Sequence, residues 1–225
     1  PDVVGPEIVA QLRFLQDRLP PFPVEEARQI LGEEIGPKVW TLIEDLGPPV
    51  AAASIAQVHP ATLRGDGRKL AIKVLRPNVR ARFRRDIGTF YFIAGVVEAI
   101  VPASARLRPT AVVAHFEGVV NTELDLRLEA AAASEFRDNA ADDPKLFVPA
   151  IHWELTGKRT LAMEWVDGLP VDPEVLRAAG HDLPDIAVRV IRVFLSHALR
   201  DGYFHADMHQ GNLRIAPDGT LITLD

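Results

Sequence analysis

The stretch PPVAAASIAQVHPATLRGDGRKLAIKV, residues 48–74, decides the fold predicted for this chain. Its short apolar runs predict strands, and RGDGR at 64–68 predicts a hairpin turn between two of them. A strand, a tight bend, a second strand and a third strand with one lysine can hold phosphate groups, and glycine normally forms the bend. Here the lysine is Lys73 and the bend is Ala51-Ala52-Ala53-Ser54. A phosphate site built on alanine and an ordinary β-meander both remain open.

Composition places the chain among soluble globular proteins. Its 225 residues can bury one large core or two small ones. Hydrophobic residues make up 48% and charged residues 25%, as in ordinary soluble domains. The net charge of -6 argues against a general nucleic-acid-binding protein, which would present a basic face. The chain has no cysteine for disulfide bonds, so nothing points to secretion.

The two ends of the chain and its longest apolar stretch indicate whether the sequence is a whole protein and whether it enters a membrane. Because the chain starts at Pro1 and stops at Asp225 directly after a strand-like run, we expect a piece of a longer protein. Charged side chains among the first twenty residues do not suit a signal peptide. The longest apolar stretch, residues 87–101, is about five residues short of a bilayer span and contains Glu98. It predicts a packed helix.

The rest of the chain alternates helices and short strands. Apolar residues recur with helical spacing at 6–19 and 24–46, with breaks at 20–23 and 36–37. Further helices are predicted at 78–101, 110–139 and 183–200. Strands are predicted in LFVPAIHWEL and RTLAMEWV, joined by a turn at 156–158, and in a final hairpin of LRIA and TLITL. This order suits a two-lobed enzyme with a cleft at 166–170.

The densest polar cluster, HADMHQGN at 205–212, has three interpretations. His205, Asp207 and His209 at alternate positions suit a metal site of the kind that hydrolases use. In the second interpretation, Asp207 orients a hydroxyl group and Asn212 holds Mg²⁺, as in a kinase catalytic loop. The third is a polar turn held by hydrogen bonds.

Spacing favours the catalytic loop. Asn212 lies five residues after Asp207, as in kinases, and the hairpin that follows leads to Asp225. Asn and Asp are oxygen ligands, which suit Mg²⁺ better than Zn²⁺. A metal hydrolase has no use for Asn212, the hairpin and Asp225 together, whereas the catalytic-loop interpretation uses all three.

Lys73 needs an anionic partner if its strand is buried. A lysine on a strand is usually a solvated edge residue, but apolar residues flank this one on both sides in LAIKVL. A buried ammonium group requires a counter-charge, which ATP phosphates and a helix glutamate would supply. Glu129 shares a helix face with Leu126 and Phe136 and precedes the small-residue run AAAAS, which permits close packing. We therefore predict an ion pair between Lys73 and Glu129.

Five ordered motifs resemble those of a known family. AAASIAQVH, AIKVLRP, ELDLRLEA, FHADMHQGN and the terminal LD are similar to motifs of the UbiB/AarF family of atypical kinase-like proteins, and of its bacterial UbiB branch in particular. LPPFPVEEARQIL extends the resemblance to nearly the whole chain. It implies an α+β, protein-kinase-like two-lobed fold with an alanine-rich loop in place of the glycine-rich one. The implied parts are a helical extension at 1–47, the smaller lobe with a helical insert at 48–166, and the start of the larger lobe at 167–225, truncated after the metal-binding aspartate.

The resemblance also implies a role for each candidate site residue. Lys73 would be the ATP lysine, Glu129 the helix glutamate and Asp207 the catalytic-loop aspartate. Asn212 and Asp225 would hold Mg²⁺, and Glu123 and Asp125 would form the family's acidic motif, a turn and a half before Glu129 and within reach of the cleft. The expected nucleotide contacts are Ala51, Ala52, Ala53, Ser54, Lys73, Glu164 and Val166. The implied cofactors are ATP and Mg²⁺.

The chain departs from the family pattern at two places. The family's lysine-x-glycine-glutamine motif, expected before residue 1, is missing, and the proline pair of the catalytic loop is replaced by Met208 and Gln210. The implied function is an Mg-ATP-binding ATPase or small-molecule or lipid kinase that supports ubiquinone biosynthesis. The alternative is a non-catalytic scaffold that responds to nucleotide or lipid and organises biosynthetic enzymes at the membrane.

Partners and location follow the same expectation. We expect ATP or ADP, a ubiquinone-pathway lipid or biosynthetic enzymes as partners, and no nucleic acid. Five arginines in RPNVRARFRRD, residues 76–86, could lie on an anionic membrane surface, but a charged run is usually a solvated face, which we favour. The expected location is cytoplasmic, or peripheral on the cytoplasmic face of the inner membrane.

Overall fold

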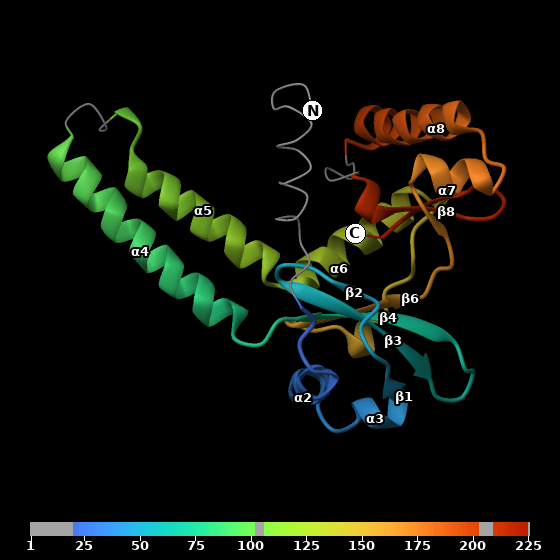
Figure 1. The fold of residues 1–225 in the computed structure, drawn as a ribbon, viewed down its shortest axis with the longest axis horizontal. Helices are drawn as coiled ribbons and strands as arrows, with labels where there is room; N and C mark the ends of the chain where they lie inside the picture. Colours follow the sequence, from blue (N-terminus) through green and yellow to red (C-terminus); the bar gives the residue numbers. More distant parts are fainter. Residues whose placement is uncertain (1–19, 102–105, 203–208, 225) are drawn as a thin grey trace.

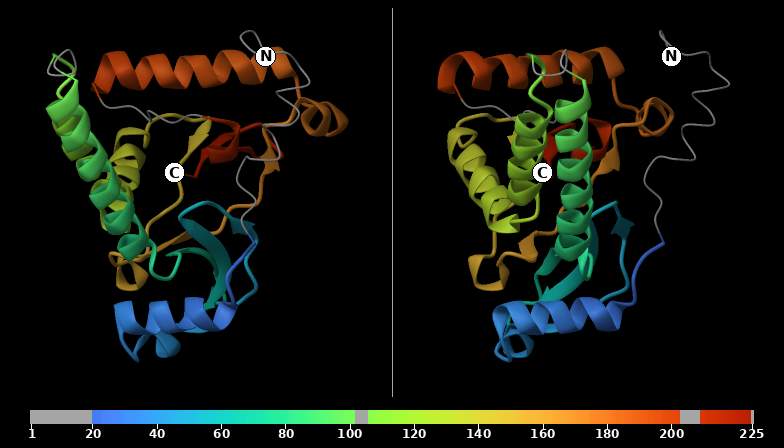
Figure 2. Two further views of the ribbon diagram at one scale, coloured as in Figure 1. Left: turned by 60° about the vertical axis from the view of Figure 1, so that its left-hand side comes forward. Right: turned by 90° about the vertical axis from the view of Figure 1, so that its left-hand side faces the viewer.

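The chain folds into two packed lobes with a helical hairpin projecting from one of them (Figure 1). The computed structural model describes residues 20–101, 106–202 and 209–224. Each lobe contains a β-sheet and its own helices, so the α+β, kinase-like two-lobed prediction is confirmed. Helices α2 and α8 lie at opposite ends of the molecule in both views of Figure 2.

The sheet of the smaller lobe contains the stretch from which the fold was predicted. Its strands run in the order β1 (Ile43–Leu46), β3 (Ala56–Leu63), β4 (Lys69–Leu75) and β6 (Thr160–Glu164), and the short β2 (Ala51–Ala52) pairs with β3. All these pairings are antiparallel. The predicted turn joins β3 to β4, with Gly65 and Gly67 at φ angles of 101° and 69° that favour glycine. The β-hairpin prediction is confirmed.

Alternation along the strands divides the core between two faces of this sheet. Leu70, Ile72 and Val74 of β4 are fully buried with α2 (Val24–Ile35) and α3 (Val39–Leu42). Because successive strand residues point to opposite faces, Lys73 points to the other side, where Leu161 and Met163 of β6 pack with α6 (Leu126–Asn139). The lysine is thereby directed to the face that carries Glu129.

The sequence prediction of a helix through residue 46 is wrong at its end. The helix pattern stops at Leu42, and Ile43–Leu46 forms β1 at the edge of the sheet. Ile43 and Leu46 are buried while the two residues between them are exposed, an apolar spacing of three that suits a helix as well as an irregular strand. The register of β1 against β3 shifts between these two residues.

The single helix predicted at 110–139 is two helices. Helix α5 (Pro109–Glu123) packs against α4 (Val79–Ile100) as a hairpin, and α6 starts afresh at Leu126. Asp125 causes the break, because its side chain accepts a hydrogen bond from the Arg127 backbone N–H and so caps α6. Helix α4 was predicted within a residue at each end.

The larger lobe has a four-stranded sheet in the order β5 (Leu146–Phe147), β9 (Leu221–Thr223), β8 (Leu213–Ile215), β7 (Leu169–Pro170). Helices α7 (Pro173–Ala178) and α8 (Leu183–Ser196) pack on it, and a π-helical turn, η3 (His197–Asp201), continues α8. The predicted hairpin of LRIA and TLITL is β8 and β9. Helix α6 contributes to both lobes, with Ala130 in the smaller core and Phe136 in the larger one.

The strand predicted in LFVPAIHWEL is mostly irregular. Only Leu146–Phe147 is a strand, and it joins the sheet of the larger lobe through a parallel pairing with β9. Ile151 makes one bridge to Met163, and Trp153–Leu155 forms the 3-10 turn η2. Pro149 and the return from one lobe to the other fall in this segment, which explains why a long apolar run forms so little strand.

Candidate nucleotide site

The alanine-rich loop is a tight hairpin between β2 and β3. Ala51 pairs with Val58 and Ala52 with Gln57, and the Ala53 N–H donates to the Ala56 carbonyl at 2.8 Å. Within the described residues, positive φ angles outside glycine occur only at Asn78 and Arg108. The loop therefore bends without the left-handed conformations for which a phosphate loop needs glycine. This backbone is one that alanine tolerates.

Arg76 holds this loop from the end of β4. Its Nε donates to the Ala53 carbonyl at 2.9 Å, and its backbone N–H donates to the Ile55 carbonyl at 2.8 Å. The same guanidinium bonds the Pro20 carbonyl and lies 5.9 Å from the centre of the Phe22 ring. One side chain thus fixes the loop to the strand that carries Lys73 and to the chain that enters the lobe.

Lys73 and Glu129 form the predicted ion pair. The Lys73 Nζ lies 2.7 Å from Glu129 Oε1 and 2.9 Å from Oε2, so both carboxylate oxygens accept hydrogen bonds from one ammonium group. The side chains are 20% and 22% exposed, which leaves the pair partly shielded from water. Val58 on β3 and Leu161 on β6 flank Lys73 in the sheet. The prediction of an ion pair is confirmed.

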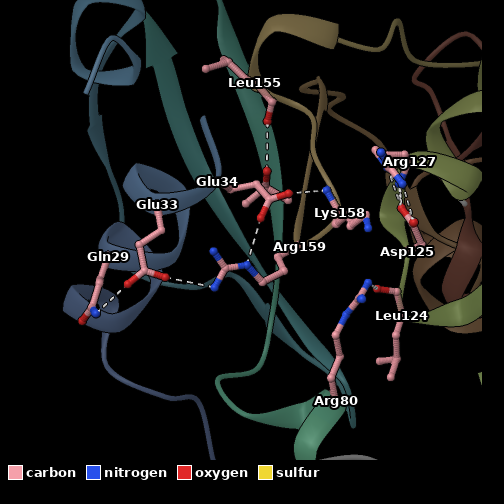
Figure 3. A network of polar contacts seen from close by, with 11 residues as sticks. Gln29, Glu33, Glu34, Arg80, Leu124, Asp125, Arg127, Leu155, Lys158 and Arg159 are labelled. Carbon is pink, nitrogen blue, oxygen red and sulfur yellow. Dashed lines mark hydrogen bonds and ion pairs between the residues drawn. The ribbon is translucent and has the colours of Figure 1, made fainter. Parts of the chain in front are cut away.

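A polar network positions the helix that carries Glu129 (Figure 3). Glu34 near the end of α2 accepts hydrogen bonds from the Lys158 backbone N–H and from Arg159 Nε. The Lys158 carbonyl in turn accepts from the Leu126 N–H, at the first residue of α6, at 3.1 Å. Gly157 permits this approach, because a Cβ at that position would lie 2.5 Å from the Glu34 Cγ. The turn at 156–158 thus joins α2 to the start of α6.

A second buried network fixes where the chain enters the lobe. The Gln57 side chain receives the Phe22 N–H at 3.1 Å and donates to the Phe22 carbonyl at 3.1 Å. Its amide nitrogen also contacts His59 Nε2 at 2.8 Å, so this ring nitrogen must be the acceptor. His59 Nδ1 then carries the hydrogen and donates to the Gly47 carbonyl at 2.7 Å. Burial lowers the pKa of His59, in agreement with a neutral ring.

The acidic motif lies at the break between α5 and α6. Glu123 is the exposed last residue of α5, and Asp125 caps α6 one helical turn before Glu129. Arg127 binds both oxygens of Asp125, through Nε at 2.9 Å and Nη2 at 2.7 Å, as Figure 3 shows. These hydrogen bonds lower the pKa of the Asp125 carboxyl group. In this arrangement Asp125 stays ionised and is engaged by Arg127.

The predicted catalytic segment is only partly within the described residues. His205, Asp207, Met208 and Asp225 lie outside them. The following turn, η4 (Gln210–Asn212), is described: His209 Nδ1 accepts from the Gly211 N–H at 2.9 Å, and the Asn212 carbonyl accepts from the Leu224 N–H at 2.9 Å. The last contact brings the position before Asp225 next to Asn212.

The donor set fits a magnesium ion better than zinc. Within residues 20–101, 106–202 and 209–224, no three or more His, Asp or Glu side chains cluster closely enough to hold a metal. The predicted ligands Asn212 and Asp225 have oxygen donors, and Mg²⁺ accepts such incomplete sets when phosphate and water complete them. His209 Nδ1 already accepts a backbone hydrogen bond from the Gly211 N–H, so in this arrangement that nitrogen is occupied.

The remaining predicted contacts lie where β6 leaves the sheet. Glu164 is the last residue of β6, opposite Leu70, and its backbone N–H donates to the Ala150 carbonyl at 2.8 Å. Val166 follows two residues later, half-buried, in the segment that leads to β7 of the other lobe. These two positions therefore mark the crossing between the lobes. Their roles in binding nucleotide stay predictions.

Sequence reasoning missed the residues that support the site. Arg76 was grouped with a basic run, Gln57 and His59 were not singled out, and Glu34 lay in a helix with no assigned role. A signal was present for Gln57 and His59, because both are polar residues in a strand that the pattern predicts to be buried. Nothing in the sequence reveals the pairing of Glu34 with a turn more than a hundred residues away.

The fold and the ion pair define a kinase-like domain. A model of the family described as the ABC1 atypical kinase-like domain matches residues 14–225. The chain belongs to this family. The prediction of family made from the motifs is confirmed.

Curated relatives include proteins named probable protein kinase UbiB. The one from Marinobacter nauticus is 41% identical over 214 residues, which cover 94% of this chain and 39% of the relative. The one from Shewanella woodyi is 38% identical over 217 residues, covering 96% of this chain and 40% of the relative. The chain thus spans about two fifths of the length of these relatives.

A solved structure has the same fold. The complex of Rv3197 with erythromycin from Mycobacterium tuberculosis superposes with a TM-score of 0.73 at 28% sequence identity. The similarity covers 91% of this chain and 51% of that one. The fold described above has therefore already been seen in a solved structure.

Proposed function

We propose that the chain is the nucleotide-binding part of a UbiB-type kinase-like protein that binds Mg-ATP and catalyses phosphoryl transfer or ATP hydrolysis. The observation that carries the proposal is the ion pair of Lys73 with Glu129, on the strand β4 that pairs with β3 of the alanine-rich hairpin. In kinases, a strand lysine held by a helix glutamate contacts the phosphates of ATP. Family membership and the two-lobed fold support the same function.

The described residues would bind and orient the nucleotide. Lys73 would donate hydrogen bonds to phosphate oxygens while Glu129 fixes the direction of its side chain. The alanine-rich loop, held by Arg76, would cover the phosphates from above. Asn212 and Asp225 would hold Mg²⁺, which neutralises charge on the phosphates when bound. Asp207 would orient the attacking hydroxyl group or water by accepting its hydrogen bond.

The molecule that accepts the phosphoryl group is proposed from the resemblance of the motifs to the UbiB branch. We infer a role in ubiquinone biosynthesis, either by phosphorylating a small molecule or lipid or by coupling ATP hydrolysis to the handling of such a lipid. The names of the relatives from Marinobacter nauticus and Shewanella woodyi support a kinase-like chemistry. The chain spans about two fifths of the length of those relatives. The activity should therefore be measured both on this chain and on a protein of the relatives' full length.

The test is a rapid-mixing measurement of phosphate release from ATP with Mg²⁺. We expect a burst of inorganic phosphate in the wild type that Asp207→Asn abolishes while ATP binding, measured by calorimetry, persists. Lys73→Met should weaken binding itself. Phosphate release unchanged by Asp207→Asn would reject Asp207 as a catalytic residue. ATP binding without any release, in both chain lengths, would favour the non-catalytic scaffold.

A further inference from the structure

The outward face of helix α4 is apolar although nothing in the described structure covers it. Helix α4 packs on α5 and the smaller lobe through Ile87, Tyr91 and Ala94. On the opposite side, Phe92 is 72% exposed and Ile100 is 71% exposed, and Ile93 and Val96 are exposed as well. A surface helix normally carries polar residues on this side, and a helix that is apolar all round is normally buried. This face is therefore built to be covered.

Basic residues continue the same face toward the body of the protein. At about 100° per residue, Arg82, Arg85, Thr89, Phe92, Val96 and Ile100 all fall on one side of the helix. Arg82 and Arg85 are exposed, and they lie before the apolar part of the stripe. The stripe from Arg82 to Ile100 is roughly 27 Å long, at the helical rise of about 1.5 Å per residue.

The tip of the hairpin repeats this combination. Leu107, which follows the turn between the helices, is 74% exposed, and its neighbours Arg106 and Arg108 are exposed too. Figure 1 shows the hairpin extending well away from both lobes, so its outer side can approach a flat surface without hindrance from them. Arginines thus lie at both ends of an apolar surface on a projecting element.

Helix α4 contains two acidic residues, of which one is turned away from this surface and the other lies at its edge. Glu98 accepts hydrogen bonds from the Thr110 N–H at 3.0 Å and from its hydroxyl group at 2.8 Å, on the side of α5. Asp86 lies at the margin of the stripe, next to Arg85. The whole chain has a net charge of -6, so this basic and apolar surface is a local exception.

We propose that the outer face of α4, defined by Arg82, Arg85, Phe92, Ile93, Val96 and Ile100, lies on an anionic lipid bilayer. The apolar side chains would enter the boundary between headgroups and acyl chains, and the arginines would remain at headgroup level, where long basic side chains keep contact with phosphate. No helix within the described residues is long and apolar enough to span a membrane. This replaces our preference for a merely solvated basic run.

Charge favours lipid over a second copy of the chain on this face. In a two-fold pairing of antiparallel α4 helices, Arg82 and Arg85 of one copy would approach Arg106 and Arg108 of the other, and like charges repel. An anionic surface instead attracts all four arginines at once. The same residues that oppose self-association favour the bilayer.

The test is co-sedimentation of the protein with vesicles of phosphatidylcholine alone and of phosphatidylcholine mixed with phosphatidylglycerol. We expect binding to the mixed vesicles that weakens as salt is raised, because exposed charges are screened. The affinity of the double variant R82A/R85A for the mixed vesicles should be lower than that of the wild type by about tenfold or more. Arg84→Ala is the matched control, since Arg84 is exposed on another side of the same helix and should leave binding unchanged.

The apolar part is tested by Val96→Asp, which should remove binding. Val188→Asp is its control, because Val188 is also an exposed valine, on α8, with an exposed fraction of 52% against 39% for Val96. Nucleotide binding, measured on each variant, should be that of the wild type and shows that the fold is intact. Equal binding to both vesicle types, no binding at all, or loss of binding in Val188→Asp but not in Val96→Asp would overturn the proposal. Concentration-dependent dimerisation that Val96→Asp abolishes would assign the face to a second copy instead.

Discussion

The Arg76 guanidinium donates to the carbonyl oxygen of Ala53 at 2.9 Å, across the gap between the end of β4 and the alanine-rich loop. The loop is therefore held to the end of β4 by a residue three positions after Lys73. We expect Arg76→Lys to weaken ATP binding several-fold, because an ammonium group cannot reproduce the fork that holds two carbonyl groups. Calorimetry measures this, with Arg68→Lys as control, since Arg68 pairs with Asp66 in an exposed turn. Unchanged affinity in Arg76→Lys would show that the loop needs no such support.

Replacing loop alanines with glycine should alter nucleotide preference. The loop bends without positive φ angles, and glycine at Ala52 or Ala53 would admit conformations that alanine disfavours. We expect affinity for ATP, or the preference for ATP over ADP, to change several-fold, roughly 1 kcal/mol. Titration calorimetry with both nucleotides tests it, and Ala178→Gly on α7 provides a substitution remote from the site. If the loop variants bind both nucleotides as the wild type does, residues 51–54 do not cover phosphate.

The ion pair of Lys73 and Glu129 should show measurable coupling. Each side chain is about one fifth exposed, so removing one leaves the other charge partly buried without its partner. In a double-mutant cycle of Lys73→Met and Glu129→Gln, the coupling should be about 0.5–3 kcal/mol in the free energy of unfolding. Denaturant titration provides all four values. A coupling near zero would mean that the two groups stabilise the lobe independently.

Stability should fall in mild acid because of His59. Its pKa is lowered by burial in the fold, so near and below the ordinary histidine pKa of about 6.5 the unfolded chain binds more protons than the folded one. The stability that the neutral His59 ring contributes is fully present above that pH and is lost as the pH falls. A protonated Nε2 would face the Gln57 amide hydrogens. When thermal unfolding is measured from neutral to acidic pH, the Tm of His59→Asn should fall less steeply with pH than the Tm of the wild type. His115→Asn, at an exposed position on α5, should keep the slope of the wild type.

Magnesium should bind only together with nucleotide. Asn212 and Asp225 offer too few oxygen ligands alone, and phosphate oxygens and water would supply the rest. Calorimetry should therefore show Mg²⁺ binding in the presence of an ATP analogue that is not hydrolysed and none in its absence. Tight binding of Zn²⁺ without nucleotide, lost in a His205→Ala/His209→Ala variant, would instead support the metal-hydrolase interpretation.

The sequence predicted the parts of the site that depend on local pattern. The hairpin at 64–68 and the direction of Lys73 follow from turn residues and strand alternation, and Glu129 follows from its place on a helix face. The break at Asp125 was missed because apolar spacing continues across it, and only its cap reveals the new helix. Strand β1 was missed because its buried residues are three apart, as on a helix.

The support around the site could not be predicted for a different reason. Arg76 and Gln57 act through backbone carbonyl and amide groups of residues distant in the chain, and every residue offers such groups. Sequence identifies a side chain able to make these bonds but not the partner that folding brings to it. The fold had to be known before these residues acquired a role.

Lys73 and Glu129 are separated by 56 positions in the chain, and this separation bears on the order in which the protein folds. Closing a flexible loop of that length costs entropy before the contact forms. The α4–α5 hairpin fills most of it with local helix contacts, and Arg80 at its start bonds the Leu124 carbonyl at its end. Because local helical contacts form fastest, the hairpin can collapse first and bring the two ends together. The α4–α5 hairpin would then form before the ion pair, and Lys73 and Glu129 would come together only after the hairpin has brought β4 and α6 close to each other.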